Sequence, residues 1–292
     1  MIRVFLALLL MMMVTSLQAS LPMDVCFKGE ERFYQLTDKL KEHAEKLRAT
    51  PIGERTAYIG RWLVGTPYKG YTLEIHDRVE AASCNLQGLD CWTFFETALA
   101  FARMAEEPVE NWTPQTLLKY IELDRYWGGK CTGDYLSRLH YLEDWLHDND
   151  RRGLVQDLTP SLGGIGVRNS AIEMTKGWKS YRYMRNSAAA RAGIAKLEAG
   201  LRKKPLVMIP KSKVAAIESK LQSGDVIGIV SRDGSAYGTS HVGLALRKNG
   251  VLHFMHASAP RNHGKVVIDS RLSDYLARFK SHAGILIARP LK

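Results

Sequence analysis

The chain has 292 residues, of which 46% are hydrophobic and 24% are charged, and its formal net charge at pH 7 is +11. This length suffices for one large domain or two small ones. The lysines and arginines are spread along the whole chain, without a basic block or a basic run interleaved with aromatic residues. The composition therefore does not indicate nucleic acid as a partner.

Residues 1–19 have the pattern of a secretory signal peptide. Arg3 precedes an unbroken apolar run from Val4 to Val14, and small and polar residues follow up to Ala19, the expected cleavage site. The run is too short to cross a bilayer, which needs about 20 residues; a membrane anchor is the alternative. No later run is long enough to span a membrane. We therefore expect an exported protein of the periplasm or cell envelope, whose positive charge suits an anionic envelope polymer.

The spacing of apolar residues predicts helices in the first half of the chain and strands in the second. We expect helix over 30–63 with a break at Thr50-Pro51, a second helix from about 90 to 105, and a third over 134–146. A mixed region over 150–215 contains a basic amphipathic segment near 180–204. Short β-rich runs follow at 225–230, 241–247, 251–258, 265–269 and 283–288. Helices first and strands later predict an α+β domain with an antiparallel sheet.

Cys91 stands at the predicted start of the second helix. Gly88 marks the preceding turn, and Asp90 is a plausible N-cap. In the first helical turn the positive end of the helix dipole favours thiolate, the reactive form of cysteine. The alternative is a buried structural cysteine, or one half of a disulfide with Cys84. Apart from Cys91, the chain has Cys26, Cys84 and Cys131, so at most one disulfide can form among these three.

Two histidines are predicted to lie on one face of a hairpin. Asn249-Gly250 between two alternating runs indicates a two-residue type I′ turn, so each facing pair of residue numbers sums to 499. His241 and His256 are then diagonal neighbours on one face, whereas His253 points the other way. One imidazole can orient the other. A structural histidine is the alternative reading, and a three-residue loop would change the register.

These residues belong to an ordered set of motifs that resembles the NlpC/P60 papain-like cell-wall hydrolases. That family has the pattern G-x-P-Y, D-C-S-G, L-x-x-G-D, H-V-G and H-A-S. The matching segments here are Gly65-Thr66-Pro67-Tyr68, Asp90-Cys91, Leu221-Gln222-Ser223-Gly224-Asp225, His241-Val242-Gly243 and His256-Ala257-Ser258. Trp92-Thr93 replaces the usual Ser-Gly, and a long insertion separates helix and sheet. Both departures resemble the N-acetylmuramoyl-L-alanine amidase-like branch, once called domain of unknown function 1460.

The resemblance implies a papain-like fold: N-terminal helices, with the nucleophile at a helix N-terminus, packed on an antiparallel sheet. Residues 20–292 would form a single catalytic domain with a long, mostly helical insertion over about 106–215. It further implies that Cys91 attacks, His241 transfers the proton, His256 orients His241, and Tyr68 lies near the oxyanion. We add the backbone N–H of Cys91 as an oxyanion donor. Packing of Tyr68 after Pro67 is the alternative.

The predicted third helix supplies candidate substrate-binding residues: Arg138, His140 and Tyr141. On a helix, Asp134, Arg138 and Tyr141 share a face with Trp145. Arg138 could bind a substrate carboxylate through two hydrogen bonds, or it could pair with Asp134. Tyr126, Trp127 and Trp145 are better explained as core residues than as a sugar platform.

The sequence thus predicts hydrolysis of an amide in peptidoglycan or muropeptides through a thioester, without a cofactor. We expect no metal, because the paired histidines lack an obvious third acidic ligand in a local motif. Three alternatives stay open: an endopeptidase that cuts between γ-D-glutamate and diaminopimelate, a non-catalytic wall-binding protein, and a zinc peptidase. The sequence leaves open the amide that is cut, the choice between intact wall and soluble fragments, the physiological role and the oligomeric state.

Overall fold

The computed structural model describes residues 21–292, so the predicted signal peptide lies outside the described residues. The central element is an antiparallel sheet of eight strands in the order β4-β5-β10-β6-β7-β8-β9, with β3 paired to the other end of β10. Its strands are β3 (Val155–Asp157), β4 (Ile165–Arg168), β5 (Pro205–Pro210), β6 (Val226–Asp233), β7 (Ala236–Lys248), β8 (Val251–Ala257), β9 (Val266–Arg271) and β10 (His282–Pro290). The short strands β1 (Phe27–Lys28) and β2 (Cys84–Asn85) form a separate parallel pair.

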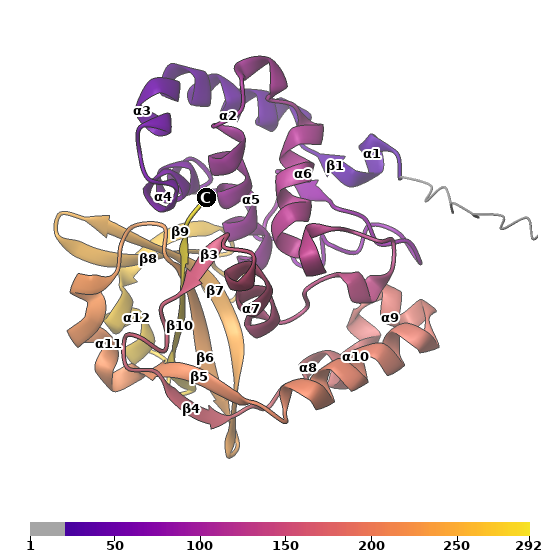
Figure 1. Ribbon diagram of the computed structural model, residues 1–292, viewed down its shortest axis with the longest axis vertical. Helices are drawn as coiled ribbons and strands as arrows, with labels where there is room; N and C mark the ends of the chain where they lie inside the picture. Colours follow the sequence, from indigo (N-terminus) through magenta and orange to yellow (C-terminus); the bar gives the residue numbers. More distant parts are fainter. Residues whose placement is uncertain (1–20) are drawn as a thin grey trace, which may run out of the picture.

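Helices cover both faces of this sheet (Figure 1). The N-terminal group is α1 (Met23–Cys26), α2 (Glu30–Glu42), α3 (Ala44–Arg48), α4 (Ile52–Trp62), α5 (Cys91–Met104), α6 (Pro114–Arg125) and α7 (Leu142–Arg151). The later helices are α8 (Glu173–Lys176), α9 (Arg182–Asn186), α10 (Ala188–Leu201), α11 (Lys211–Ile217) and α12 (Leu272–Ala277). Single 3₁₀ turns lie at Val109–Asn111, Trp127–Gly129, Tyr135–Ser137, Trp178–Ser180 and Glu218–Lys220.

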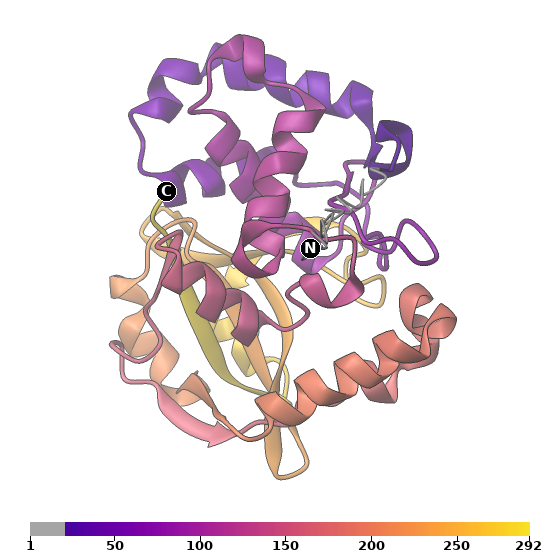
Figure 2. The same cartoon turned by 45° about the vertical axis from the view of Figure 1, so that its right-hand side comes forward.

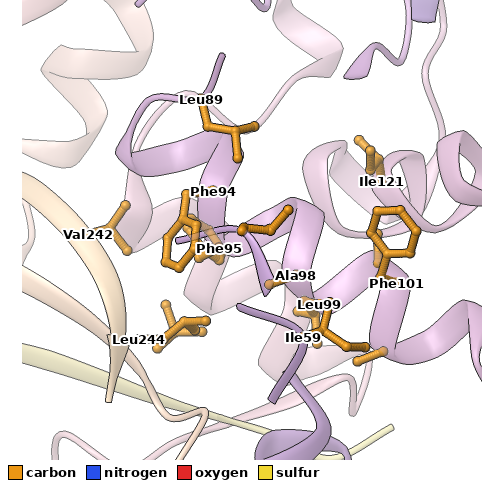
Figure 3. Packing of buried hydrophobic residues seen from close by; sticks show 14 of the residues in the cluster. Ile59, Leu89, Phe94, Phe95, Ala98, Leu99, Phe101, Ile121, Val242 and Leu244 are labelled. Atoms are coloured by element: carbon orange, nitrogen blue, oxygen red, sulfur yellow. The ribbon is translucent and has the colours of Figure 1, made fainter. Parts of the chain in front are cut away.

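The two faces of the sheet have separate apolar cores. On one face Phe94 and Phe95 of α5 pack near Val242 and Leu244 of β7, as Figure 3 shows. On the other face alternate residues such as Ile227 pack against α11 and α12. Because both faces are covered, β6 reads as a continuous apolar run rather than an alternating one. The predicted α+β class with an antiparallel sheet is confirmed.

The predicted helix over 134–146 is wrong. A 3₁₀ turn covers Tyr135–Ser137, the chain is extended at Arg138 and Tyr141, and α7 begins only at Leu142. Arg138 forms an isolated antiparallel β-bridge with Tyr126, so the backbone here pairs with another extended segment instead of forming helical hydrogen bonds. The shared face proposed for Asp134, Arg138 and Tyr141 therefore does not exist. The predicted break near Pro51 and the helix from Asp90 are confirmed.

The region expected as an insertion contains α6 to α10 but also contributes β3, β4 and β5 to the sheet. In Figures 1 and 2, α8, α9 and α10 lie to one side of the sheet. Within residues 21–292, no helix is both long and apolar enough to span a membrane.

Candidate active site

Cys91 is the first residue of α5, and a reciprocal capping box fixes this helix start. The Asp90 carboxylate accepts from the Thr93 N–H at 2.8 Å, and the Thr93 hydroxyl oxygen accepts from the Asp90 N–H at 2.9 Å. The expected N-cap is confirmed, and Thr93, which departs from the family pattern, supplies half of the box. These two hydrogen bonds hold the backbone on both sides of Cys91.

The thiol of Cys91 is protonated at neutral pH, contrary to the expected thiolate. Burial raises its pKa to about 12, the Asp90 carboxylate adds to this, and backbone N–H groups of Val242, Trp92 and Cys91 oppose it. The penalty for burying a charge thus outweighs the donors at the helix start. The N–H of Val242 places the sulfur beside the residue that follows His241.

His241 and His256 are hydrogen-bonded to each other, with 2.7 Å between His241 Nε2 and His256 Nδ1. The predicted register is confirmed, because Leu244 faces Met255 and Lys248 faces Val251. The turn residues Asn249 and Gly250 have φ angles of 52° and 80°, as a type I′ turn requires. His253 lies outside the pair, and its Nδ1 contacts the carbonyl of Asp269.

Two features of β7 bring the rings together. A Cβ atom at Gly243 would lie 2.8 Å from His256 Cβ and 2.5 Å from the Met255 carbonyl oxygen, so only glycine leaves room there. Against β6, the register shifts between Ile229, which faces His241, and Val230, which faces Thr239. Ser240 is the extra residue of this bulge, and bulges re-aim neighbouring side chains.

Asp269 of β9 extends the histidine pair, although no motif in the sequence marks this residue. His256 Nε2 lies 3.4 Å from Asp269 Oδ2. Asp269 Oδ1 accepts from the Ser270 N–H at 2.6 Å and from Arg278 at 2.5 Å. Although burial opposes its ionisation, these hydrogen bonds hold the pKa of Asp269 well below its usual range. A strand prediction for 265–269 contained the residue, but nothing in the loop before it fixes the β8–β9 register.

Both imidazoles are neutral at neutral pH. Burial lowers the pKa of His241 well below its ordinary value, and the neighbouring His256 lowers it further. Burial also lowers the pKa of His256, while Asp269 partly offsets this effect. The rings pack against Phe254, with centroids 5.9 Å away for His241 and 4.7 Å for His256. The site therefore combines a neutral thiol with a neutral histidine pair.

Tyr68 lies beside the helix start, as expected. It forms a parallel bridge with Leu89, and its N–H donates to the carbonyl of Gly264 at 2.8 Å. Burial raises the pKa of the Tyr68 phenol, and the nearby Cys91 and Asp90 raise it further. The phenol thus stays a proton donor near Cys91.

A cavity of about 710 Å³ brings together all the predicted site residues except His256. His256 is 1% exposed and lies behind His241. The residues that line the cavity include Tyr68, Cys91, Trp92, Arg138, His140, Tyr141, Tyr181, Thr239 and His241. Cys91 and His241 thus share one cavity, although they are 150 positions apart in the sequence.

Arg138 is a buried structural cation rather than a free clamp. It is 4% exposed, and its guanidinium lies 3.4 Å from Glu74 and 3.7 Å from Glu80. The proposed partner Asp134 instead caps the N–H of Leu136. The correct partners come from the loop before β2, which sequence spacing does not connect to Arg138.

His140 and Tyr141 line the cavity, but one ring nitrogen of His140 and the hydroxyl of Tyr141 are already hydrogen-bonded within the protein. His140 Nε2 lies 2.8 Å from the carbonyl oxygen of Tyr135. The Tyr141 hydroxyl donates to Glu198 at 2.6 Å. Burial lowers the pKa of His140 well below its ordinary value. Both residues therefore shape the cavity wall.

The aromatic residues and cysteines outside the cavity were also subjects of predictions from the sequence. Tyr126 and Trp145 are core residues, as predicted, but Trp127 is 37% exposed. All four cysteines are free thiols, so no disulfide links Cys26, Cys84 or Cys131. No group of three or more metal-ligating side chains occurs in the described part of the chain.

A sequence model described as N-acetylmuramoyl-L-alanine amidase-like matches residues 58–285. A search of curated proteins gave no match. Among solved structures, an N-acetylmuramoyl-L-alanine amidase from Bacteroides uniformis is 28% identical, with a TM-score of 0.72, over 82% of this chain and 99% of that one. A Bacteroides fragilis protein named as a candidate xylanase is 34% identical, with a TM-score of 0.68, over 79% of this chain and 98% of that one. A Legionella pneumophila protein that belongs to domain of unknown function 1460 shares the fold. It is 22% identical, with a TM-score of 0.63, over 90% of this chain and 97% of that one.

Proposed function

Since the chain belongs to the N-acetylmuramoyl-L-alanine amidase-like family, we propose that it hydrolyses the amide between the muramoyl lactyl group and L-alanine in peptidoglycan or its fragments. Cys91 is the proposed nucleophile and His241 the base. One observation carries this proposal: His241 shares a cavity with Cys91 and heads a hydrogen-bonded chain through His256 to Asp269.

The carboxylate of Asp269 determines where the protons of this chain lie. An ionised carboxylate only accepts hydrogen bonds, so His256 Nε2 carries a proton. Neutral His256 then has an unprotonated Nδ1, which accepts from His241 Nε2–H across 2.7 Å. Neutral His241 is left with a free lone pair on Nδ1. This nitrogen is the proposed base for the thiol.

In the first step the Cys91 sulfur attacks the lactyl carbonyl carbon while His241 Nδ1 takes the thiol proton. The carbonyl oxygen becomes an oxyanion, for which the Cys91 N–H and the Tyr68 hydroxyl are the proposed donors. The imidazolium formed on His241 is stabilised through His256 by the negative charge of Asp269. Transfer during attack fits a thiol that is neutral at rest.

The amide C–N bond then breaks, and His241 gives its proton to the amine of the departing alanine. This leaves a thioester between Cys91 and the lactyl carbonyl. Water then attacks the thioester, with His241 taking a proton from it. The C–S bond breaks, Cys91 regains its proton, and the muramic acid carboxylate is released.

Glycoside hydrolysis, the activity that the Bacteroides fragilis name suggests for that protein, fits this cavity poorly. It usually needs two available carboxyl groups across the scissile bond. Of the carboxylates that line the cavity, Glu74 accepts from Tyr135, and Asp90 is bound to Thr93. Glu173 is left without a matching second carboxylate among the lining residues.

Product analysis on defined muropeptides tests the proposal. Mass spectrometry should detect peptides with a free alanine amine and the sugar with a free lactyl carboxylate. Cleavage after γ-D-glutamate would instead identify the endopeptidase. Cys91→Ala and Cys91→Ser should abolish turnover and retain the fold, whereas Cys131→Ser, a matched change at a half-buried thiol, should retain activity. Turnover by Cys91→Ala would contradict the mechanism.

We also propose that the protein acts in the periplasm or cell envelope, on the basis of the signal pattern in residues 1–19. Fractionation of cells that express the full chain tests this localisation. A mature N-terminus at Ser20 in the exported fraction would support it. Retention of the uncleaved chain in the cytoplasm would contradict it.

A further inference from the structure

Although lysines and arginines occur along the whole chain, the segment 173–204, which contains α8, α9 and α10, has few acidic residues and therefore a large share of the net charge. It contains nine lysines and arginines and two glutamates, so its net charge is 9 − 2 = +7, against +11 for the whole chain. One of the two glutamates, Glu198, is 1% exposed and is bound to Tyr141 and to the N–H groups of Met174 and Thr175. The other, Glu173, lines the cavity.

Two of these cations lie over one indole ring, and a third is hydrogen-bonded to the backbone of one of them. Arg191 lies 4.9 Å from the ring centroid of Trp178, and Lys179 lies 5.9 Å from it. Arg185 donates to the carbonyl of Lys179 at 3.0 Å, and Arg191 donates to the carbonyl of Arg185 at 3.5 Å. We refer to Lys179, Arg185 and Arg191 as the Trp178 cluster.

In the described part of the chain, no carboxylate forms an ion pair with the Trp178 cluster. Among residues 21–292 none of its three members forms an ion pair, although the neighbouring Arg182 pairs with Asp77 at 2.6 Å. Lys179 and Arg185 are exposed. Like charges held close together repel one another, so an anionic partner at this position is favoured on electrostatic grounds.

The Trp178 cluster is next to the cavity along the chain. Tyr181 directly follows the 3₁₀ turn of Trp178 and lines the cavity, where its ring centroid lies 5.9 Å from that of the exposed Tyr71. Glu173 and Met174, at the start of the same segment, also line the cavity. Figure 1 shows this segment as a helical extension beside the sheet. A long polymer held by the cluster would thus reach the cavity.

We propose that the Trp178 cluster binds carboxylates of stem peptides that neighbour the one being cut, and so anchors the protein on intact peptidoglycan. This inference rests on the proposed function and names the polymeric wall as its substrate. A membrane surface fits less well, because interfacial helices insert large apolar side chains. None of the exposed large apolar residues of the described chain lies within 173–204.

The test is binding of the full chain to purified, phosphate-free peptidoglycan sacculi, measured by co-sedimentation at low salt. Lys179→Glu with Arg185→Glu should weaken binding roughly tenfold, and the difference should shrink as salt rises. Lys39→Glu with Lys213→Glu is the control, because it makes the same charge change at two exposed lysines outside the segment. Amidation of the wall carboxylates should abolish binding of the unmodified chain.

Measurements of hydrolysis distinguish a role in binding the wall from a role in catalysis. The Trp178 cluster variant should lose hydrolysis of sacculi about as much as it loses binding, and should keep kcat/KM on a single soluble muropeptide. Cys91→Ala should bind sacculi normally. Equal binding by the cluster and control variants would overturn the proposal, as would binding only to walls that retain phosphate polymers. If binding follows the cluster but a different bond is cut, anchoring stands and the proposed amidase activity falls.

Discussion

His256 and Asp269 lie on adjacent strands, with Nε2 of the imidazole 3.4 Å from Oδ2 of the carboxylate. The other carboxylate oxygen accepts from the Ser270 N–H and from Arg278. This arrangement gives Asp269 a defined orientation, with donors on one side and His256 on the other. If Asp269 acts in catalysis through His256, its replacement should change which nitrogens of His256 and His241 carry protons.

In Asp269→Asn the amide oxygen should occupy the side with the donors Ser270 and Arg278, so the NH₂ group faces His256. It would donate to His256 Nε2 and force the proton onto Nδ1. That proton would be donated to His241 Nε2, leaving His241 Nδ1 protonated and unable to accept from the thiol. We expect kcat to fall by about 10²–10⁴ with KM nearly unchanged.

The readouts are steady-state kinetics and ¹⁵N NMR of labelled histidine, which reports the tautomer of His241. Asp274→Asn is the matched control, since it removes the same charge from an exposed residue of α12. It should leave both kcat and the His241 tautomer unchanged. An unaltered tautomer in Asp269→Asn, with unaltered kcat, would remove Asp269 from the mechanism.

Alkylation of Cys91 should show the pH dependence of a buried neutral thiol. Because burial raises its pKa to about 12, the thiolate fraction rises about tenfold per pH unit from pH 6 to 10. The rate of labelling by iodoacetamide, followed at Cys91 by mass spectrometry, should rise in parallel. His241→Ala should not change this slope. A rate that is already constant from pH 6 upward would instead indicate a thiolate–imidazolium pair.

Gly243→Ala should disrupt the histidine pair. Its Cβ would lie 2.8 Å from His256 Cβ and 2.5 Å from a backbone oxygen, so β7 and β8 must move apart. We expect a loss of about 1–3 kcal/mol in the free energy of unfolding and a larger proportional loss of kcat. Gly200→Ala on α10 meets no atom within 4 Å and should be neutral or stabilising. Denaturant unfolding and kinetics measure both, and a fully active Gly243→Ala would contradict the close packing.

Arg138→Gln should act on stability rather than on substrate binding. It leaves buried Glu74 and Glu80 without their cation, which should cost about 3–5 kcal/mol of unfolding free energy. Asp134→Asn, at the partner expected from helical spacing, should cost less than about 1 kcal/mol. Thermal melts at pH 7 test both changes. An unchanged melting temperature for Arg138→Gln with a raised KM would restore the substrate-clamp hypothesis.

Local signals predicted the parts of the site that depend on local structure. An N-cap places Cys91, and an Asn-Gly turn sets the register that joins His241 to His256; both are readable within ten or so residues. Asp269 and the partners of Arg138 depend on pairings across irregular loops, for which the sequence contains no register signal. The thiol pKa was mispredicted for a different reason: the dipole is visible in sequence, whereas the burial that outweighs it arises only from tertiary packing.

The last strand, β10, is an interior strand of the sheet, lying between β5 and β6. Until β10 has been synthesised, β6 is paired with β7 on one side only, so the sheet that carries His241 is incomplete. Arg103 of α5 also donates to the carbonyl of Lys292, which follows β10. Long-range pairing of this kind slows folding. Hydrolytic activity should therefore require β10, and removal of β10 should reduce activity far more than removal of the edge strand β4, which carries none of the proposed catalytic residues.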